Sequence, residues 1–196
     1  MNKDICFFDF DGTITRRDTL FEFSKFALGK KRVFIALLKS LLAIIKWKIG
    51  FSTNSQAKEI LFTHLFKNYP YLEFKQKGKE FASHIDTILR PDTVDILRRH
   101  LAEGRCAVIV SASMAEWIEP WAEKNGFEQV IATKPQIDPD TKKITGRFAT
   151  PNCVGDEKVA RIKELYPDLT SLETWAYGDS KSDLPMLALS NHPHLI

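Results

Sequence analysis

The chain alternates between short apolar runs and longer segments in which apolar residues recur every three or four positions. The apolar runs have the length of strands and cover residues 5–10, 105–113, 127–133, 173–179 and 192–196. Helical periodicity separates the later runs, over about 92–103, 114–125, 155–166 and 182–190. Strands that alternate with helices predict an α/β fold with a parallel sheet and right-handed crossovers.

Two segments interrupt this alternation. Residues 134–149 contain two short β-type runs around the turn Asp138-Pro139-Asp140, which predicts a small hairpin. Residues 16–89 carry helical patterns only and follow the first strand directly. We therefore expect residues 1–15 and 90–196 to form an α/β core, and residues 16–89 to form a helical cap domain over the end of the first strand.

One segment of the insertion, residues 32–48, is unusually apolar. Three of its charged residues, Arg32, Lys39 and Lys46, are spaced by seven, so they form one narrow basic stripe on a helix. The apolar part would be about 22 Å long, shorter than the roughly 30 Å of bilayer hydrocarbon. Two interpretations follow. Either this helix packs its wide apolar face on its neighbours in the cap, or it lies in a membrane interface with its lysines near lipid phosphates.

The composition of the 196 residues, 44% hydrophobic and 27% charged, is that of an ordinary soluble globular protein. A net charge of +3 is too small to indicate nucleic-acid binding. Cys6, Cys106 and Cys153 match no metal or redox spacing, and buried reduced thiols are expected. The first apolar run is too short for a signal peptide, so we expect a cytoplasmic location.

The first apolar run ends in "FFDFDGT", where Asp9 and Asp11 stand two positions apart. Like charges this close cost free energy, so the stretch is either a solvated turn or the site of a cation. In a strand, residues i and i+2 face the same side, which would direct both carboxylates to one place. In an open parallel sheet that place is the carboxyl edge, where ligands bind.

Residues that could bind a phosphate group or a metal ion also follow other predicted strands. Ser111 and Ala112 precede a predicted helix whose N-terminus suits a phosphate oxygen, although Ser111 alone could be a simple helix cap. Asp179 follows the fourth strand, and Lys158 lies in the first turns of the 155–166 helix. Three carboxylates, from Asp9, Asp11 and Asp179, form an all-oxygen cluster that suits Mg²⁺, and Lys158 supplies a second positive charge.

Four motifs in order, "DFDGT", "VIVSAS", the lysine of "GDEK" and "GDSKSD", resemble those of the haloacid dehalogenase (HAD) superfamily of phosphatases. The stretches "DGTITRRDTLFEF" and "PNCVGDEKVARI" more narrowly resemble its phosphoserine-phosphatase-like subfamily IB. The resemblance covers essentially the whole chain. It implies a three-layer Rossmann-like core with a parallel sheet, plus an inserted helical cap of the C1 type.

The resemblance also implies roles for individual residues. Asp9 would be the nucleophile that forms an aspartyl-phosphate, and Asp11 the general acid and then the general base. The side chains of Asp9 and Asp179 and the backbone carbonyl of Asp11 would hold Mg²⁺. The remaining motif residues would bind the phosphoryl group (Ser111, Ala112 and Lys158) or support the metal and the lysine (Gly178 and Asp183).

The substrate is less closely specified. Phosphoserine phosphatases usually carry Ser-Thr and then a glutamate where this chain has Arg16, Arg17 and Asp18, which argues against phosphoserine. "TRRDTLF" with a basic-striped apolar cap is also similar to bacterial phosphatidylglycerophosphate phosphatases. We expect a phospholipid head group such as phosphatidylglycerophosphate, or a small organic phosphate, with peripheral membrane contact through residues 32–48.

Alternatives stay open at this stage. The chain could be a phosphoserine phosphatase, a phosphotransferase that passes the phosphoryl group to an alcohol, or a non-catalytic binding protein. Arg16, Arg17 and Arg147 either contact the substrate or brace the hinge and the hairpin.

Overall fold

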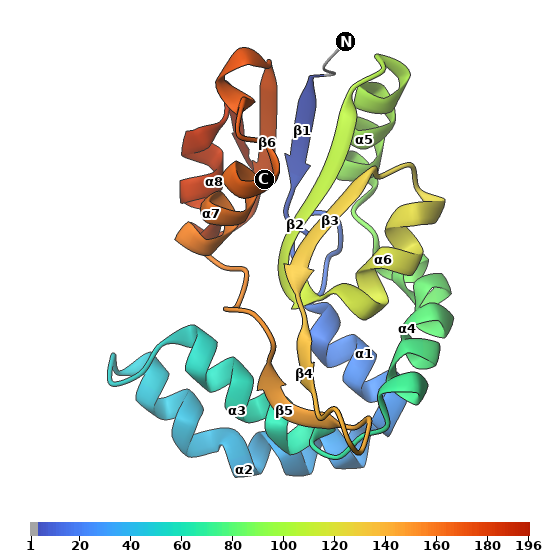
Figure 1. Cartoon of the computed structure of the whole chain (residues 1–196), viewed down its shortest axis with the longest axis vertical. Helices are drawn as coiled ribbons and strands as arrows, with labels where there is room; N and C mark the ends of the chain where they lie inside the picture. Colours follow the sequence, from blue (N-terminus) through green and yellow to red (C-terminus); the bar gives the residue numbers. More distant parts are fainter. Residues whose placement is uncertain (1–3) are drawn as a thin grey trace.

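A five-stranded, fully parallel sheet forms the centre of the computed structural model, which describes residues 4–196 (Figure 1). Its strands, in spatial order, are β3 (Gln129–Thr133), β2 (Cys106–Met114), β1 (Ile5–Phe8), β6 (Thr174–Gly178) and β7 (His192–Leu195). Strands β2 and β3 lie on one side of β1, and the later strands β6 and β7 lie on the other side. The strand order therefore reverses beside β1. Such a reversal opens a ligand-binding crevice at the carboxyl ends of the strands. The first three residues of the predicted core segment lie outside the described residues.

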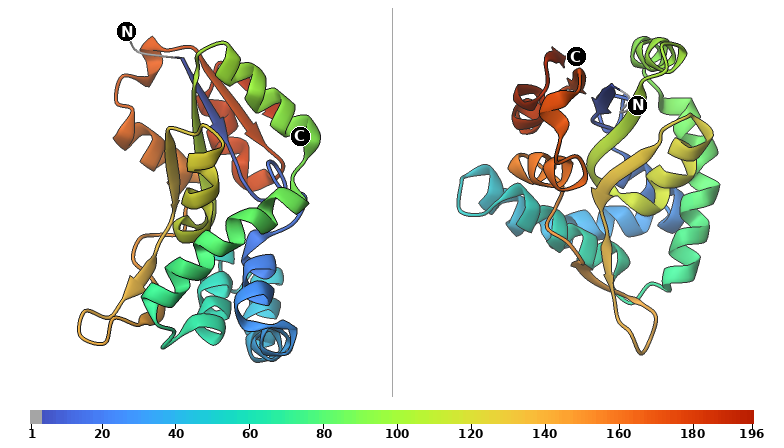
Figure 2. Two further views of the ribbon diagram at one scale, coloured as in Figure 1. Left: turned by 90° about the vertical axis from the view of Figure 1, so that its right-hand side faces the viewer. Right: turned by 45° about the horizontal axis from the view of Figure 1, so that its top comes forward.

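Helices cover both faces of the sheet, which confirms the predicted three-layer α/β class. The helices α5 (Pro91–Ala102) and α6 (Ala115–Lys124) lie on one face, and α7 (Asp156–Leu165) and α8 (Leu184–Leu189) on the other (Figures 1 and 2). Side chains of β1 alternate between the two layers: Cys6 and Phe8 join the core under α5 and α6, whereas Ile5 and Phe7 join the core under α7 and α8. Because both faces are buried, the strand is apolar at every position.

The helical insertion lies at the carboxyl end of the sheet (Figure 1). It consists of α1 (Thr19–Leu28), α2 (Lys30–Lys48), α3 (Asn54–Phe66) and α4 (Tyr71–Ile85). The predicted hairpin is confirmed as the antiparallel pair β4 (Pro135–Ile137) and β5 (Ile144–Phe148), and it packs on α3. Three short 3₁₀ turns complete the chain at Asp86–Ile88, Leu169–Ser171 and Lys181–Asp183.

The two connections between the insertion and the sheet run side by side. The amide of Arg16 donates to the carbonyl of Ile88 at 2.7 Å, and the amide of Arg90 donates to the carbonyl of Ile14 at 2.8 Å. An aromatic cluster continues from the insertion into the sheet layers: Phe23 of α1 stacks on Trp117 of α6 with ring centroids 4.4 Å apart. These contacts hold the insertion over the carboxyl ends of the strands.

The packing of helix α2 differs from the first of the two interpretations, in which its wide apolar face packs on its neighbours in the cap. Only Val33, Ala36 and Ser40 are buried, and they face α1 and α3. Large apolar side chains on the opposite side are exposed, including Phe34 at 62% and Leu42 at 75%. The buried side of α2 uses small and β-branched residues because α3 lies close. Across residues 4–196, no helix has the length and apolar character needed to cross a membrane.

All three cysteines lie in the described part of the chain, where they are buried and form no disulfide, as the sequence predicts. The Cys6 thiol donates to the carbonyl of Cys106 at 3.3 Å, and burial raises the pKa of Cys6 to about 12. Burial likewise raises the pKa of Cys153 to about 11. These thiols therefore stay protonated at neutral pH and act as small apolar core groups.

Candidate active site

The turn after β1 carries the first two carboxylates. The strand was expected to extend to residue 10 but ends at Phe8, so the argument that Asp9 and Asp11 face one side of a strand is wrong. The amide of Asp9 still donates to the carbonyl of Tyr177 in β6 at 2.9 Å, and the chain then turns at Gly12. Gly12 has φ +88°, and a Cβ there would lie 2.1 Å from Oδ2 of Asp179. The turn therefore needs glycine to bring the ends of β1 and β6 together.

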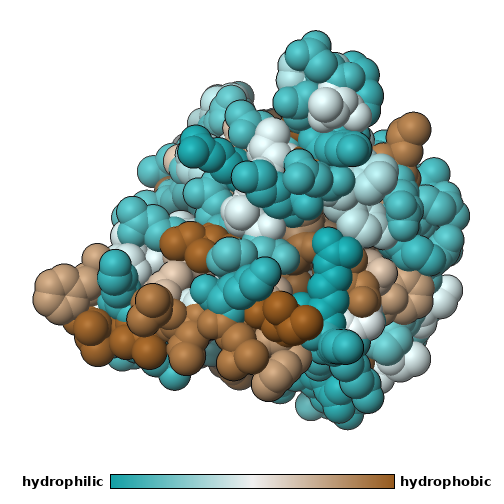
Figure 3. Space-filling model, turned by 90° about the horizontal axis from the view of Figure 1, so that it is seen from below, coloured by the Kyte–Doolittle hydropathy of each residue, from teal (hydrophilic) through white to brown (hydrophobic). Residues whose placement is uncertain are grey.

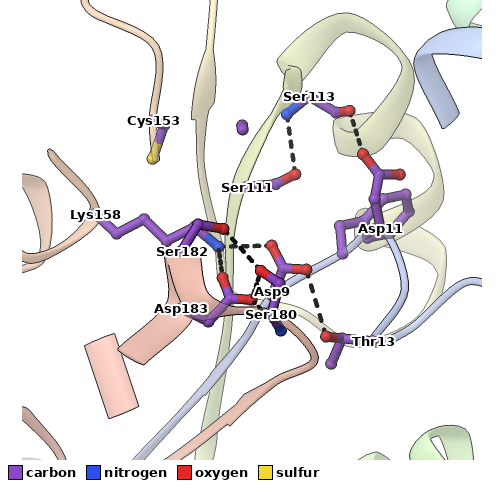
Figure 4. A network of polar contacts seen from close by, with 12 residues as sticks. Asp9, Asp11, Thr13, Ser111, Ser113, Cys153, Lys158, Ser180, Ser182 and Asp183 are labelled. Carbon is purple, nitrogen blue, oxygen red and sulfur yellow. Dashed lines mark hydrogen bonds and ion pairs between the residues drawn. The ribbon is translucent and has the colours of Figure 1, made fainter. Parts of the chain in front are cut away.

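Asp9 is held by a buried lysine (Figure 4). Nζ of Lys158 donates to Oδ1 of Asp9 and to Oδ1 of Asp183, both at 2.6 Å. Only 1% of the Lys158 side chain is exposed. The other oxygen of Asp9, Oδ2, accepts from the Thr13 hydroxyl at 3.3 Å. The carboxylate of Asp9 is thus fixed at both oxygens, with Lys158 shared between two acids.

Burial and the neighbouring charges shift the pKa values of Asp9 and Lys158 in opposite directions. Burial raises the pKa of Asp9 to about 7, against the opposing effect of the Lys158 ammonium. For Lys158, burial lowers the pKa, but the carboxylates of Asp9 and Asp183 outweigh it and the pKa is raised. Lys158 therefore stays charged inside the protein because it has two acidic partners.

The carboxylates of Asp9, Asp179 and Asp183 converge. One oxygen from each lies within 4.8 Å of the other two. When all three are ionised, Lys158 balances only one of the three negative charges, and burial raises the pKa of Asp179. A divalent cation would neutralise the remaining charge, and an all-oxygen donor set is the kind that Mg²⁺ takes. The residues present therefore fit Mg²⁺. Asp183 belongs to this cluster, whereas the Asp11 carboxylate points elsewhere.

Asp11 is directed toward the insertion and the end of β2. Oδ1 of Asp11 accepts from the Thr19 amide at 2.8 Å and from the Thr19 hydroxyl at 2.6 Å. Oδ2 accepts a short hydrogen bond from the Ser113 hydroxyl (Figure 4). Trp117 Nε1 donates in turn to the Thr19 hydroxyl at 3.0 Å. Burial, followed by the nearby Asp18 carboxylate, raises the pKa of Asp11, while Lys58 and these hydrogen bonds oppose the shift.

Ser111 and Ala112 lie within β2, not at a helix N-terminus as expected. The strand continues to Met114 with a register shift after Ser111, and α6 begins only at Ala115. The Ser111 hydroxyl oxygen accepts from the Ser113 amide at 3.1 Å. Lys58 of α3 donates to the carbonyl of Ala112 at 3.0 Å. This bulged strand end therefore connects the sheet to the insertion beside Asp11.

The loop after β6 positions Asp183. Its Oδ2 accepts from the amide of Ser180 at 3.1 Å and from the hydroxyl of Ser180 at 2.7 Å. A Cβ on Gly178 would lie 2.4 Å from Cβ of Asp183, so glycine is required for this close approach. Asp183 is 1% exposed, and its other oxygen holds Lys158.

These groups line one cavity of about 390 Å³ between the sheet and the insertion. Its polar floor comprises Asp9, Asp11, Ser111, Lys158 and Asp179. Its wall includes five apolar side chains from α1, α2 and α3, namely Leu20, Phe21, Ile44, Trp47 and Leu61. The cavity therefore has a charged end and an apolar side.

The remaining expected residues lie in different places. Asp18 lines the cavity and caps α1, accepting from the Leu20 amide at 2.9 Å. Arg16 and Arg17 line a separate hollow beside α4, where Arg17 is 3.6 Å from Glu22. Arg147 is exposed on β5 and is not among the residues that line the cavity. In the described structure, the two hinge arginines therefore lie away from the acidic cluster.

Polar residues that contact site groups but were not predicted as site residues include Thr13, Thr19, Lys58, Ser113 and Ser180. Thr13 ends the "DFDGT" motif and Ser113 ends "VIVSAS", so both stand inside recognised motifs. Thr19 stands inside the quoted stretch "DGTITRRDTLFEF", although no role was assigned to it there. Lys58 comes from α3, where neighbouring sequence carries no sign that a polar side chain faces the site.

Comparison with known proteins identifies the family. The profile of the haloacid dehalogenase-like hydrolases matches residues 6–188. This chain belongs to that family. The protein CicA of Caulobacter vibrioides is 32% identical over 189 residues, which cover 94% of this chain and 82% of CicA. A probable phosphatase of Mycobacterium tuberculosis is 31% identical, with 99% of this chain and 69% of the relative covered.

Two solved structures have folds similar to that of this chain. A Bordetella pertussis protein of unknown function superimposes with a TM-score of 0.72 and 24% identity, covering 96% of this chain and 87% of the other. A substrate-bound phosphoserine phosphatase gives a TM-score of 0.67 at 18% identity, covering 97% of this chain and 84% of the other. These likenesses agree on the fold of both the sheet layers and the insertion.

Proposed function

We propose that this HAD protein is a Mg²⁺-dependent phosphatase that hydrolyses a phosphate monoester through an aspartyl-phosphate on Asp9. The observation that carries the proposal is the Asp9 carboxylate, fixed by a buried Lys158 in a cavity that Asp11 and Asp179 also line. The cavity has a charged floor and an apolar wall, and this combination suits an ester with one phosphate group. The relative named as a probable phosphatase supports the same chemistry.

The proposed reaction has two steps. An oxygen of Asp9 attacks phosphorus and the bond from phosphorus to the ester oxygen breaks, while Asp11 gives its proton to that oxygen. Water then attacks the aspartyl-phosphate, Asp11 takes the proton from water, and phosphate leaves with Asp9 regenerated. The raised pKa of Asp11 favours the protonated acid that the first step needs.

The remaining roles follow from charge. Attack by a carboxylate on a phosphate brings anion toward anion, so positive charge and hydrogen-bond donors are needed around the phosphoryl oxygens. Lys158, the Ser111 hydroxyl and the backbone at Ala112 would provide them from this chain, and Asp183 would keep Lys158 in place. When bound by Asp9, Asp179 and the Asp11 carbonyl, with Asp183 adjacent, Mg²⁺ supplies further positive charge to the transferring group.

The apolar wall favours a substrate with an apolar part. Phosphoserine has no group that would cover Leu20, Phe21 and Trp47, whereas a lipid or another amphiphilic phosphate monoester has one. A phosphotransferase would use the same aspartyl-phosphate and differ only in the acceptor that attacks it.

The test is Mg²⁺-dependent phosphate release by the wild type and by Asp9→Asn, with and without EDTA. The panel includes phosphoserine, sugar phosphates, nucleoside monophosphates, pyridoxal phosphate and phosphatidylglycerophosphate in micelles. Asp9→Asn should lose activity by a factor of roughly 10³ or more, since Asp9 is the group proposed to form the covalent intermediate. Asp168→Asn, at an exposed aspartate, is the matched control and should keep wild-type activity.

Two results would count against the proposal. Undiminished phosphate release by folded Asp9→Asn would exclude Asp9 as the nucleophile, and undiminished release in EDTA would exclude the metal requirement. Transfer of phosphate to an added alcohol in place of release would instead establish the phosphotransferase alternative.

A further inference from the structure

The outer face of α2 is an amphipathic surface that the fold leaves uncovered. Seven large apolar residues occupy one side of it, namely Phe34, Ile35, Leu38, Leu41, Leu42, Ile45 and Ile49. At 3.6 residues per turn these positions span about 120° of the circumference. Figure 3 looks onto this end of the molecule and shows apolar side chains gathered in a band. A contiguous exposed apolar band of this kind marks an interaction surface.

Basic residues flank this apolar band on both sides. Lys39 and Lys46, with Arg32, follow one edge of the helix, and Lys30 and Lys48 lie toward the other. Residues 30–58 contain no aspartate or glutamate. Among the described residues, Lys39 and Lys46 form no ion pair that would neutralise them. The surface is therefore apolar along its middle and positively charged along its margins.

From this arrangement we infer that the outer face of α2 docks on an anionic lipid surface. A helix with a wide apolar face and lysines beside it places its apolar side chains at the acyl boundary and its ammonium groups among the phosphates. A helix groove of another protein would cover the apolar band but would leave the two basic margins without partners. An anionic lipid surface matches all three parts at once, since its acyl chains cover the apolar band and its phosphates pair with both basic margins.

The loop after α2 extends the same surface. Phe51 is 83% exposed, and together with Ile49 it continues the apolar band to the tip between α2 and α3. The opposite side of α2 contributes Ile44 and Trp47 to the cavity that contains Asp9. One helix thus has one face toward the proposed lipid surface and another toward the site. Docking would bring the apolar wall of the cavity close to the membrane interface, a consequence that rests on the proposed function.

The test measures binding, not catalysis. The wild type is sedimented with vesicles of phosphatidylcholine alone and of phosphatidylcholine mixed with phosphatidylglycerol. Binding should require the anionic lipid and should weaken as salt screens the charges. Leu42→Ser should weaken binding by about tenfold, because it removes a largely exposed anchor without disturbing the buried side of α2. Leu165→Ser, at an exposed leucine of α7, should bind as the wild type does.

A second pair of variants tests the charges. Lys39→Gln combined with Lys46→Gln should remove the preference for anionic vesicles. Lys124→Gln combined with Lys163→Gln, at exposed lysines of α6 and α7, should retain it. The two leucine variants and the two double lysine variants should all hydrolyse a soluble ester at the wild-type rate if they are folded, since none of the substituted residues lines the cavity.

Some outcomes would overturn the inference. It is wrong if the wild type ignores anionic vesicles, or if Leu42→Ser and Leu165→Ser bind equally. It is also wrong if the wild type is a dimer that Leu42→Ser converts to a monomer, since a second copy would then cover α2. Asp9→Asn should bind vesicles as tightly as the wild type. Loss of docking and loss of the proposed chemistry are therefore observed separately.

Discussion

Asp9 and Asp11 are two positions apart and have different surroundings. Asp9 is bound by an ammonium group, whereas Asp11 accepts three hydrogen bonds from neutral donors. A nucleophile must be ionised and a general acid must carry a proton, so a pair of acids with separate environments can serve both needs. Because β1 ends at Phe8, before both residues, strand alternation does not align the two side chains.

Asp11→Asn tests this division of roles. Turnover of an alkyl phosphate should fall by about 10²–10⁴, since neither the leaving group nor the attacking water can exchange a proton with the site. With p-nitrophenyl phosphate, the leaving phenolate needs no proton. Stopped-flow absorbance should then show a burst of about one nitrophenolate per active site, followed by slow turnover. Equal loss on both esters with no burst would contradict the assignment, and Asp168→Asn should match the wild type.

Glu116 provides a pH-dependent prediction for stability. Burial raises the pKa of Glu116 from 4.5 to about 7, although the Tyr71 hydroxyl donates to its Oε1 at 3.1 Å. Between these values the unfolded chain loses the proton and the folded protein keeps it, so stability falls as the pH rises. Glu116→Gln has no such loss. The free energy of unfolding of the wild type relative to this variant should therefore drop by about 3 kcal/mol from pH 4.5 to pH 8.

Urea unfolding of both proteins across this pH range measures the difference. Other titrating groups are common to the two proteins, so their contributions cancel. Glu123→Gln, at an exposed glutamate of the same helix, should show no such trend. A constant difference between the wild type and Glu116→Gln would mean that Glu116 is ionised in the folded protein.

At the scale of elements, α4 and α6 approach each other unusually closely. A Cβ on Gly78 of α4 would lie 2.2 Å from the carbonyl oxygen of Glu116 and 3.3 Å from Cα of Trp117. These are backbone atoms, so they cannot move aside as the end of a side chain would. Glycine in the middle of a helix usually weakens it, but here it allows the contact that places Trp117 beneath the insertion.

Gly78→Ala should therefore destabilise the protein by about 1–3 kcal/mol, even though alanine favours the helix by roughly 1 kcal/mol. The two helices must separate to admit the methyl group. The free energy of unfolding in urea measures the effect, with Lys79→Ala on the exposed face of α4 as the control. A Gly78→Ala protein as stable as the wild type would show that the helices separate at no cost.

At the scale of the whole molecule, one aromatic cluster joins the insertion to the sheet layers. Phe23 contacts Trp117, Phe66, Phe74 and Phe81, which come from α6, α3 and α4. The same cluster continues to Phe8 of β1. Because these rings share one core, the insertion and the sheet should unfold together.

Phe23→Ala removes the ring at the centre of this cluster and should cost about 3–5 kcal/mol. Unfolding should remain a single transition, with the same midpoint by near-ultraviolet and far-ultraviolet circular dichroism. Phe51→Ala, at an exposed ring, should leave the midpoint unchanged. Two separate transitions in Phe23→Ala would show that the insertion unfolds independently of the sheet.

Local patterns in the sequence were enough to predict the α/β class, the hairpin and the neighbourhood of Asp9, Asp179 and Lys158. The physical reason is that apolar periodicity determines each element, and parallel strands bring their carboxyl ends to one edge. The boundaries of the cap and core, and the catalytic roles of the site residues, stay predictions. Catalytic roles depend on a reaction that takes place only with a substrate.

Only the tertiary structure decided which polar groups complete the site and which face of α2 stays uncovered. Lys58 of the insertion contacts the carbonyl of Ala112, which is 54 positions away, and sequence position does not encode such a distant approach. The apolar pattern of residues 32–48 indicates a buried or a membrane-facing helix equally well. Packing decides only that the wide apolar face is exposed, because α1 and α3 cover the narrow side that contains Val33, Ala36 and Ser40.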